Sequence, residues 1–143
     1  MTDIEIGQVL SLKIRYNSEG KVAEKKPPYL VVDIHEEFNT IEIAQIDSLE
    51  GKEFKAAKKS NKTIYYDYPV EKVIDKDSYI QLDNTILIEQ YEKLSFYRRQ
   101  IDKLSPEKLS ETLSAYKEYH KKNIILENKQ VYMTRDELET LNN

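Results

Sequence analysis

The stretch that decides the fold is Lys25-Lys26-Pro27-Pro28-Tyr29-Leu30-Val31-Val32-Asp33-Ile34, followed after a short connection by Ile41-Glu42-Ile43-Ala44-Gln45-Ile46-Asp47-Ser48. The prolines at the start of the first stretch block a helix, because proline lacks a backbone N–H and fixes φ. The nearly continuous apolar run behind them predicts a central strand that is covered on both faces. The second stretch alternates apolar and polar side chains, which predicts a strand that pairs with the first in antiparallel fashion.

Further short strands are predicted on both sides of this pair. An alternating pattern predicts a strand over residues 8–16, and a charged turn cluster predicts an exposed loop over 17–26. The remaining strands are expected over 63–68, 78–82 and 85–89, and 96–104 is expected to be a strand or a helix, with a strand favoured for its first half. So many short strands in about 90 residues, with little helical periodicity between them, predict a small β-barrel.

The pattern becomes helical beyond this region. Ser105-Pro106 predicts a helix that runs to about Lys122, with serine as the N-cap and proline at the first helical position. Residues 124–126 and 131–133 predict a hairpin, and the capping box Thr134-Arg135-Asp136-Glu137 predicts a last helix through Leu141. The expected fold class is therefore mainly β, or α+β: a barrel with a packed C-terminal helix and a short C-terminal extension. The face of the first helix that covers the barrel is expected to consist of Leu109, Leu113, Tyr116 and His120.

Composition limits the possible functions. At 143 residues the chain is expected to form one domain, and its net charge of −4 requires any anion site to be local. The absence of cysteine excludes disulfides, thiol nucleophiles and zinc–thiolate sites. The two histidines, His35 and His120, lack metal-ligand spacing, so we expect no metal site and no cofactor. The sequence carries no signal-peptide pattern and no apolar run of about 20 residues, which predicts a cytoplasmic protein without membrane contact.

Lys26, Asp47 and Ser48 are the candidate catalytic residues, because pairing of the two central strands brings them together. Cleavage of a phosphodiester by its own ribose hydroxyl needs a cation near the phosphate, a proton acceptor and a hydrogen-bond donor. The lysine, the aspartate and the serine can supply these three groups in that order. The alternative is that the lysine is an exposed loop charge and the other two residues belong to an ordinary strand end.

A basic segment with tyrosines behind it is the second candidate site. Residues 52–62 carry five lysines against a single Glu53. Lysine contacts to phosphate and aromatic faces for unstacked bases are common ingredients of single-strand binding. The alternative is that the lysines solvate a loop and the tyrosines alternate between core and surface. The Arg98-Arg99 step is a further basic feature that has little weight, because arginine pairs beside helices are common. The candidate RNA-binding residues are Lys25, Lys52, Lys55, Lys58, Lys59, Lys62 and Tyr65.

Five segments, in their order along the chain, are similar to those of one known family. They are Ile6-Gly7-Gln8-Val9-Leu10, Lys26-Pro27-Pro28-Tyr29-Leu30-Val31-Val32, Ile43-Ala44-Gln45-Ile46-Asp47-Ser48, Ser78-Tyr79-Ile80-Gln81-Leu82-Asp83-Asn84-Thr85-Ile86 and Leu104-Ser105-Pro106-Glu107-Lys108-Leu109. Over residues 5–120 the chain thereby resembles the MazF/PemK-type toxins of bacterial toxin–antitoxin systems.

This resemblance implies an SH3-like β-barrel over residues 1–122, with 123–143 as an extension. It also implies a homodimer that cuts single-stranded RNA without a metal, leaves a cyclic phosphate and a free 5′ hydroxyl, and is blocked by a cognate antitoxin protein. The family's catalytic arginine precedes a proline, a position that falls on Lys26 or Pro27, depending on which proline is matched. Its hydroxyl partner falls on Asp47, with Ser48 next to it. The competing hypothesis is a catalytically inactive SH3-like barrel that binds protein or RNA without cutting it.

Overall fold

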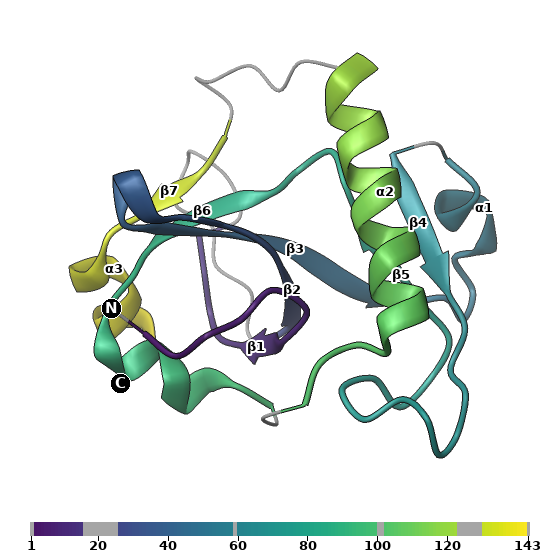
Figure 1. Ribbon diagram of the computed structural model, residues 1–143, viewed down its shortest axis with the longest axis horizontal. Helices are drawn as coiled ribbons and strands as arrows, with labels where there is room; N and C mark the ends of the chain where they lie inside the picture. The colour runs from purple at the N-terminus through teal and green to yellow at the C-terminus, as the bar shows by residue number, and fades with distance from the viewer. Residues whose placement is uncertain (1, 16–25, 59, 100–101, 123–129, 143) are drawn as a thin grey trace.

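The computed structural model describes residues 2–15, 26–58, 60–99, 102–122 and 130–142, which form an α+β fold made mainly of antiparallel sheet (Figure 1). The expected α+β class is thus confirmed. The strands are β1 (Val9–Ser11), β2 (Pro28–His35), β3 (Thr40–Ser48), β4 (Asn61–Ile64), β5 (Ser78–Gln81), β6 (Ile86–Glu89) and β7 (Tyr132–Met133). The helices are α1 (Glu53–Ala56), α2 (Pro106–Lys122) and α3 (Arg135–Asn142), and two 3₁₀ segments are η1 (Glu36–Phe38) and η2 (Glu92–Tyr97).

Strand β3 holds the sheet together because it pairs with three other strands. As predicted, β2 runs antiparallel beside it, from Tyr29 opposite Gln45 to His35 opposite Thr40. The first half of β3 also pairs with β6, and its end pairs with β5. The main path runs β1-β2-β3-β5-β4, and within the described ranges β1 and β4 are not paired with each other, so the sheet is open.

The side chains of β2 alternate between two apolar clusters, which confirms that this strand is covered on both faces. Tyr29 and Val31 belong to a first cluster, together with residues of β1, β6, η2 and the C-terminal segment. Leu30 and Val32 belong to a second cluster, together with residues of β5 and α2. The middle of the sheet is therefore buried between two separate apolar layers.

A β-bulge interrupts β2 between Val31 and Asp33. Asp33 lies opposite Glu42 of β3, and Val32 is the extra residue on the bulged strand. One extra residue shifts the alternation of side chains, so Ile34 returns to the first cluster. Asp33 consequently turns toward the opposite face, the face of the second cluster.

Helix α2 packs on the second cluster and begins where the sequence predicts. Its first hydrogen bond runs from the Leu109 N–H to the Ser105 carbonyl over 2.8 Å. The buried Glu71 carboxylate accepts hydrogen bonds from the backbone N–H of Ser105 (3.0 Å) and from its hydroxyl (2.6 Å). Lys108 Nζ lies 3.3 Å from the same carboxylate. The negative charge is stabilised there by the helix dipole, and the helix end gains a fixed partner.

The C-terminal segment completes the first cluster. Strand β7 pairs with β6 in parallel register, and Met133 and Leu138 are fully buried in that cluster. The predicted capping box is confirmed, since Thr134 Oγ1 accepts from the Glu137 N–H at 3.2 Å and Glu137 Oε1 accepts from the Thr134 N–H at 3.3 Å. Asn142 exchanges hydrogen bonds with the backbone of Lys13 over 2.6 and 2.9 Å, which ties the end of α3 to the N-terminal part of the chain.

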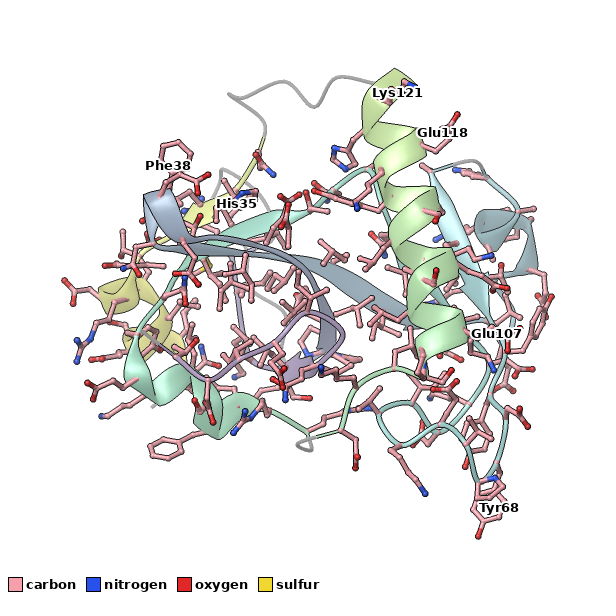
Figure 2. All side chains as sticks on the ribbon, viewed as in Figure 1. His35, Phe38, Tyr68, Glu107, Glu118 and Lys121 are labelled. Carbon is pink, nitrogen blue, oxygen red and sulfur yellow. The ribbon has the colours of Figure 1, made fainter. Side chains whose placement is uncertain are left out.

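One predicted strand, over 63–68, is met only in its first two residues, and another, in the first half of 96–104, does not form. Strand β4 ends at Ile64, because the Tyr66 N–H donates to the Asp77 side chain at 2.7 Å instead of to a neighbouring strand. Figure 2 shows Tyr68 at the tip of the following loop, where it is 78% exposed. In the second case Phe96 and Tyr97 are the last residues of the 3₁₀ segment η2. In this segment Leu94 is buried and Phe96 is exposed, so a single apolar side chain packs into the core, and no alternating pattern of buried side chains forms.

Other expectations are met in part. Within 8–16 only β1 forms a ladder, although Leu10, Leu12 and Ile14 are buried as predicted. Residues 124–126 of the predicted hairpin, and all of the predicted loop except Lys26, lie outside the described residues. No helix in the described part of the chain combines the length and the apolar character needed to cross a bilayer.

Candidate functional site

A pocket of about 230 Å³ opens where β2 begins and β3 ends. The antiparallel register places these ends side by side. Tyr29 lies opposite Gln45, so the residues that precede Tyr29 lie beside the residues that follow Gln45. We name it the proline pocket. Its lining includes Pro27, Pro28, Asp47, Ser48, Lys76 and Arg99.

The proline pocket brings together two of the three predicted catalytic residues. Asp47 and Ser48 line it, whereas Lys26 does not. The Lys26 side chain is exposed, and its Nζ lies 5.8 Å from the centroid of the Tyr97 ring, within the range of a cation–π contact. The lysine that was predicted to supply the positive charge therefore points to another part of the surface.

The Asp47 carboxylate is held by three donors. Lys52 Nζ lies 3.1 Å from Oδ1 and 3.0 Å from Oδ2, the Tyr79 hydroxyl donates to Oδ2 at 3.1 Å, and the Ser48 N–H donates to Oδ1 at 2.9 Å. Burial by itself would raise the pKa of Asp47, but the hydrogen bonds from Lys52 and Tyr79 and the charge of Lys52 outweigh it and hold that pKa below its usual value. Asp47 is thus a fixed anion and a weak proton acceptor.

Arg99 supplies the guanidinium group of the proline pocket. Arg98 forms a β-bridge with Leu10, and the Arg99 N–H donates to the Val9 carbonyl at 2.9 Å, so this segment runs along the edge of β1. The guanidinium donates to Ser11 Oγ and to the Val73 carbonyl, each over 3.3 Å. Among the described residues, no carboxylate lies within ion-pairing distance of Arg99. Its charge is therefore available to an anion that enters the pocket.

Lys76 is the second cation that reasoning from the sequence missed. It is exposed, lines the proline pocket, and in the described part of the chain forms no ion pair. Nothing in its sequence context distinguishes it from other surface lysines. Arg99 was visible as half of an arginine pair, but its place beside β1 depends on contacts between residues almost 90 positions apart, such as that between Arg99 and Ser11 (a separation of 88).

A second pocket, of about 310 Å³, adjoins the first at Asp47, which lines both. Its other lining residues include Lys55, Lys58, Asn61 and Tyr79, and we name it the basic pocket. Helix α1 carries Lys55, whose carbonyl accepts a hydrogen bond from Asn61 Nδ2 at 2.7 Å. This bond closes the basic segment back onto β4 and fixes the lysines at the end of the sheet.

The remaining candidate RNA-binding residues are dispersed. Lys52 is paired with Asp47, and Lys62 Nζ lies 3.9 Å from a carboxylate oxygen of Glu111. Tyr65 is 62% exposed, which leaves its ring accessible. Lys25 and Lys59 lie outside the described residues. Among the described lysines of the basic segment, Lys52 and Lys62 lie beside carboxylates, whereas Lys55 and Lys58 line a pocket.

No protein-family model matches this chain, and none of the curated proteins compared with it matches either. The chemistry of the two pockets can nevertheless be stated. Arg99 and Lys76 can hold a phosphate group, the first through a planar fork of donors and the second as a point charge. Ser48 can donate a hydrogen bond to a phosphate oxygen, and exposed tyrosines can stack on unpaired bases.

Proposed function

We propose that the protein is a MazF/PemK-type endoribonuclease that binds single-stranded RNA across the two pockets and cuts it without a metal. In this proposal the antiparallel sheet corresponds to an SH3-like barrel that stays open between β1 and β4 in the described part of the chain. The observation that carries the proposal is the guanidinium of Arg99, which has no acidic partner among the described residues and lies in one pocket with Pro28 and Ser48. The family resemblance implies an arginine next to a proline and a hydroxyl at the end of the next strand, and Arg99 supplies the missing arginine from another part of the chain.

The groups of the proline pocket would have separate roles in this reaction. The ribose 2′ hydroxyl loses its proton to water and attacks the adjacent phosphorus, the bond from phosphorus to the 5′ oxygen breaks, and the 5′ oxygen takes up a proton from water. Arg99 and Lys76 stabilise the negative charge that develops on the non-bridging oxygens, which is commonly the largest contribution of such a site. Ser48 donates a hydrogen bond to the leaving oxygen. The Asp47–Lys52 pair orders the wall between the two pockets.

A second function, RNA binding without cleavage, is favoured by the state of Asp47. This carboxylate accepts hydrogen bonds from Lys52, Tyr79 and the Ser48 N–H, and its lowered pKa makes it a poor general base. The lining of the proline pocket includes no histidine among the described residues. Both functions use the same cations, so binding and cleavage have to be measured separately.

Cleavage is tested with purified protein, a long single-stranded RNA and EDTA in excess. Discrete fragments with cyclic phosphate ends are expected from the wild type, and far fewer from Arg99→Ala or Ser48→Ala. Arg98→Ala removes the same charge from outside the pocket, where Arg98 is paired with Asp3, and should cut like the wild type. Intact RNA with wild-type protein, at a concentration that binds it, would establish the binding function instead. Failure to bind RNA at all would refute both.

The proposal also includes a homodimer and a cognate antitoxin. Light scattering on the purified protein tests for twice the chain mass of 16.9 kDa. Growth arrest on expression, relieved by co-expression of a neighbouring gene, tests for the antitoxin. A monomeric protein that does not affect growth would separate this chain from toxin biology.

A further inference from the structure

A buried carboxylate lies on the opposite part of the sheet from the proline pocket. Glu42 stands near the start of β3, between β2 and β6, and its side chain is 7% exposed. Thr85 Oγ1 donates to Glu42 Oε2 at 2.6 Å, and the Tyr116 hydroxyl donates to the same oxygen at 2.5 Å. A buried carboxylate needs hydrogen-bond donors or a cation beside it, because burial disfavours its charge. Two donors fix one oxygen and leave Oε1 for another partner.

That partner is His35, and Asp33 stands beside it. His35 Nε2 lies 3.0 Å from Glu42 Oε1 and 3.8 Å from Asp33 Oδ2. The other oxygen of Asp33 accepts the Ile34 N–H at 2.8 Å, which orients Oδ2 toward the imidazole. One atom from each of the three side chains lies within 4.8 Å of the other two.

The β-bulge in β2 creates this arrangement. If β2 had no bulge and Val32 lay opposite Glu42, regular alternation would direct Asp33 and His35 to the first cluster and Ile34 to the face of Glu42. With the bulge, Asp33 lies directly opposite Glu42 and His35 follows two residues later on the same face. Bulges commonly re-aim side chains next to functional sites.

We propose that Asp33, His35 and Glu42 bind a divalent transition-metal ion of the Zn²⁺ type. Ligands about 2.0 Å from a tetrahedral Zn²⁺ lie about 3.3 Å from one another, and the two observed ligand separations, 3.0 and 3.8 Å, stand on either side of that value. Two carboxylates and a neutral imidazole together offset the charge of a divalent cation. Because imidazole suits Zn²⁺ better than the harder Mg²⁺ or Ca²⁺, the site should select against the latter two.

The surroundings match those of a metal that keeps one position open. Thr85 and Tyr116 orient the Glu42 ligand through its second oxygen, and Gln130 Nε2 in turn donates to Thr85 Oγ1 at 3.1 Å. A pocket of about 390 Å³ begins at His35 and Glu42 and is walled by Phe38, Leu87, Gln130 and Tyr132. Figure 2 shows His35 and Phe38 close together at the end of β2 and at η1. A water or a small anion could enter there as the fourth ligand.

The test is calorimetric titration of Zn²⁺ into protein that has been stripped with a chelator and returned to metal-free buffer. We expect saturable binding of one ion per chain. His35→Ala and Asp33→Asn should weaken it about a hundredfold and Tyr116→Phe about tenfold, the range expected for ligands and for groups that orient them. Asp33 has a half-exposed side chain, so its variant keeps the test valid if replacement of buried Glu42 unfolds the chain.

Two matched controls separate this site from general attraction of cations. Glu107→Gln removes one negative charge from the start of α2, far from His35 (Figure 2), and His120→Gln removes the other imidazole; neither should change the affinity. Co²⁺ in place of Zn²⁺ should give visible absorption bands that His35→Ala abolishes, because these bands report direct coordination. Unsaturable binding by the wild type, or affinity that survives in both His35→Ala and Asp33→Asn, overturns the proposal. No RNA is present, so the outcome is independent of the nuclease assay.

Discussion

Lys52 Nζ contacts both carboxylate oxygens of Asp47, at 3.1 and 3.0 Å, so a residue expected to bind RNA and a residue expected to catalyse its cleavage are partners of each other. Asp47 lies in the wall shared by the proline pocket and the basic pocket. Its first role is therefore to stabilise the end of β3, a role that can be measured without any ligand.

Asp47→Asn should lower the free energy of unfolding by about 1 kcal/mol at pH 7, because the ion pair and its charged hydrogen bonds are weakened. The pKa of Asp47 lies below its ordinary value of 3.8 in the folded chain. The stabilisation is therefore present above that value and is lost as the pH falls through the lowered pKa. Urea unfolding of both proteins from pH 7 to pH 3 measures this. A difference that stays constant down to pH 3 would contradict the assignment.

Lys58→Ala should weaken binding of single-stranded RNA and flatten its dependence on salt. Each phosphate neutralised by a lysine contributes a slope of about −0.7 to the plot of log affinity against log salt for single strands. Removing one contact should reduce the slope by that amount. Lys121→Ala, at the far end of α2 (Figure 2), removes the same charge away from both pockets and should leave the slope unchanged. Equal slopes for the two variants would remove the basic pocket from the RNA path.

Gly7→Ala should destabilise the protein more than Gly51→Ala. Both glycines have positive φ, +98° and +73°, so each substitution carries a backbone strain of about 1–2 kcal/mol. A methyl group at Gly7 would also lie 2.7 Å from Leu109 Cδ2 and 3.3 Å from Lys103 Cβ, whereas nothing lies within 4 Å at Gly51. Crowding of this kind adds about 1–3 kcal/mol. Chemical unfolding of both variants measures the two losses of stability. Equal losses would show that α2 shifts at this contact without a cost in free energy.

Glu71→Gln should cost about 2 kcal/mol, because the charged acceptor at the start of α2 is lost while the shape of the side chain is kept. Ser105 and Lys108 both depend on this carboxylate. Glu107→Gln is the control: this exposed acid lies in the first turn of α2, where its interaction with the helix dipole is worth about 0.3 to 1 kcal/mol. Thermal unfolding of the two variants gives the comparison. Similar losses would mean that burial of Glu71 adds nothing to its effect.

Local signals in the sequence predicted much of the fold. The apolar run after Pro28 and the alternation from Thr40 onward each specify a strand, and a short connection leaves antiparallel pairing as the simple outcome. The Ser105-Pro106 step and the Thr134-to-Glu137 capping box specify helix starts through bonds between near neighbours. Such features depend on a few adjacent residues, which is why they can be read directly.

The predictions that failed concern features that depend on contacts between residues far apart in the sequence. Tyr66 leaves the predicted strand because its N–H finds the side chain of Asp77, eleven residues further on. Arg99 enters the proline pocket because its segment docks on β1, and no local pattern announces that contact. The bulge at Val32 has no glycine or proline to mark it, so the meeting of Asp33 and His35 with Glu42 becomes visible once the register is known.

The first cluster joins Leu10 and Leu12, near the beginning of the chain, to Met133 and Leu138, near its end. During translation the early residues leave the ribosome long before the late ones exist. The first cluster then remains incomplete until Val131, Met133 and Leu138 are made, while the second cluster, whose buried members end at Tyr116, can already form. A nascent chain halted after α2 would expose the unfinished side of the sheet, and such chains should be the ones that chaperones retain and proteases remove.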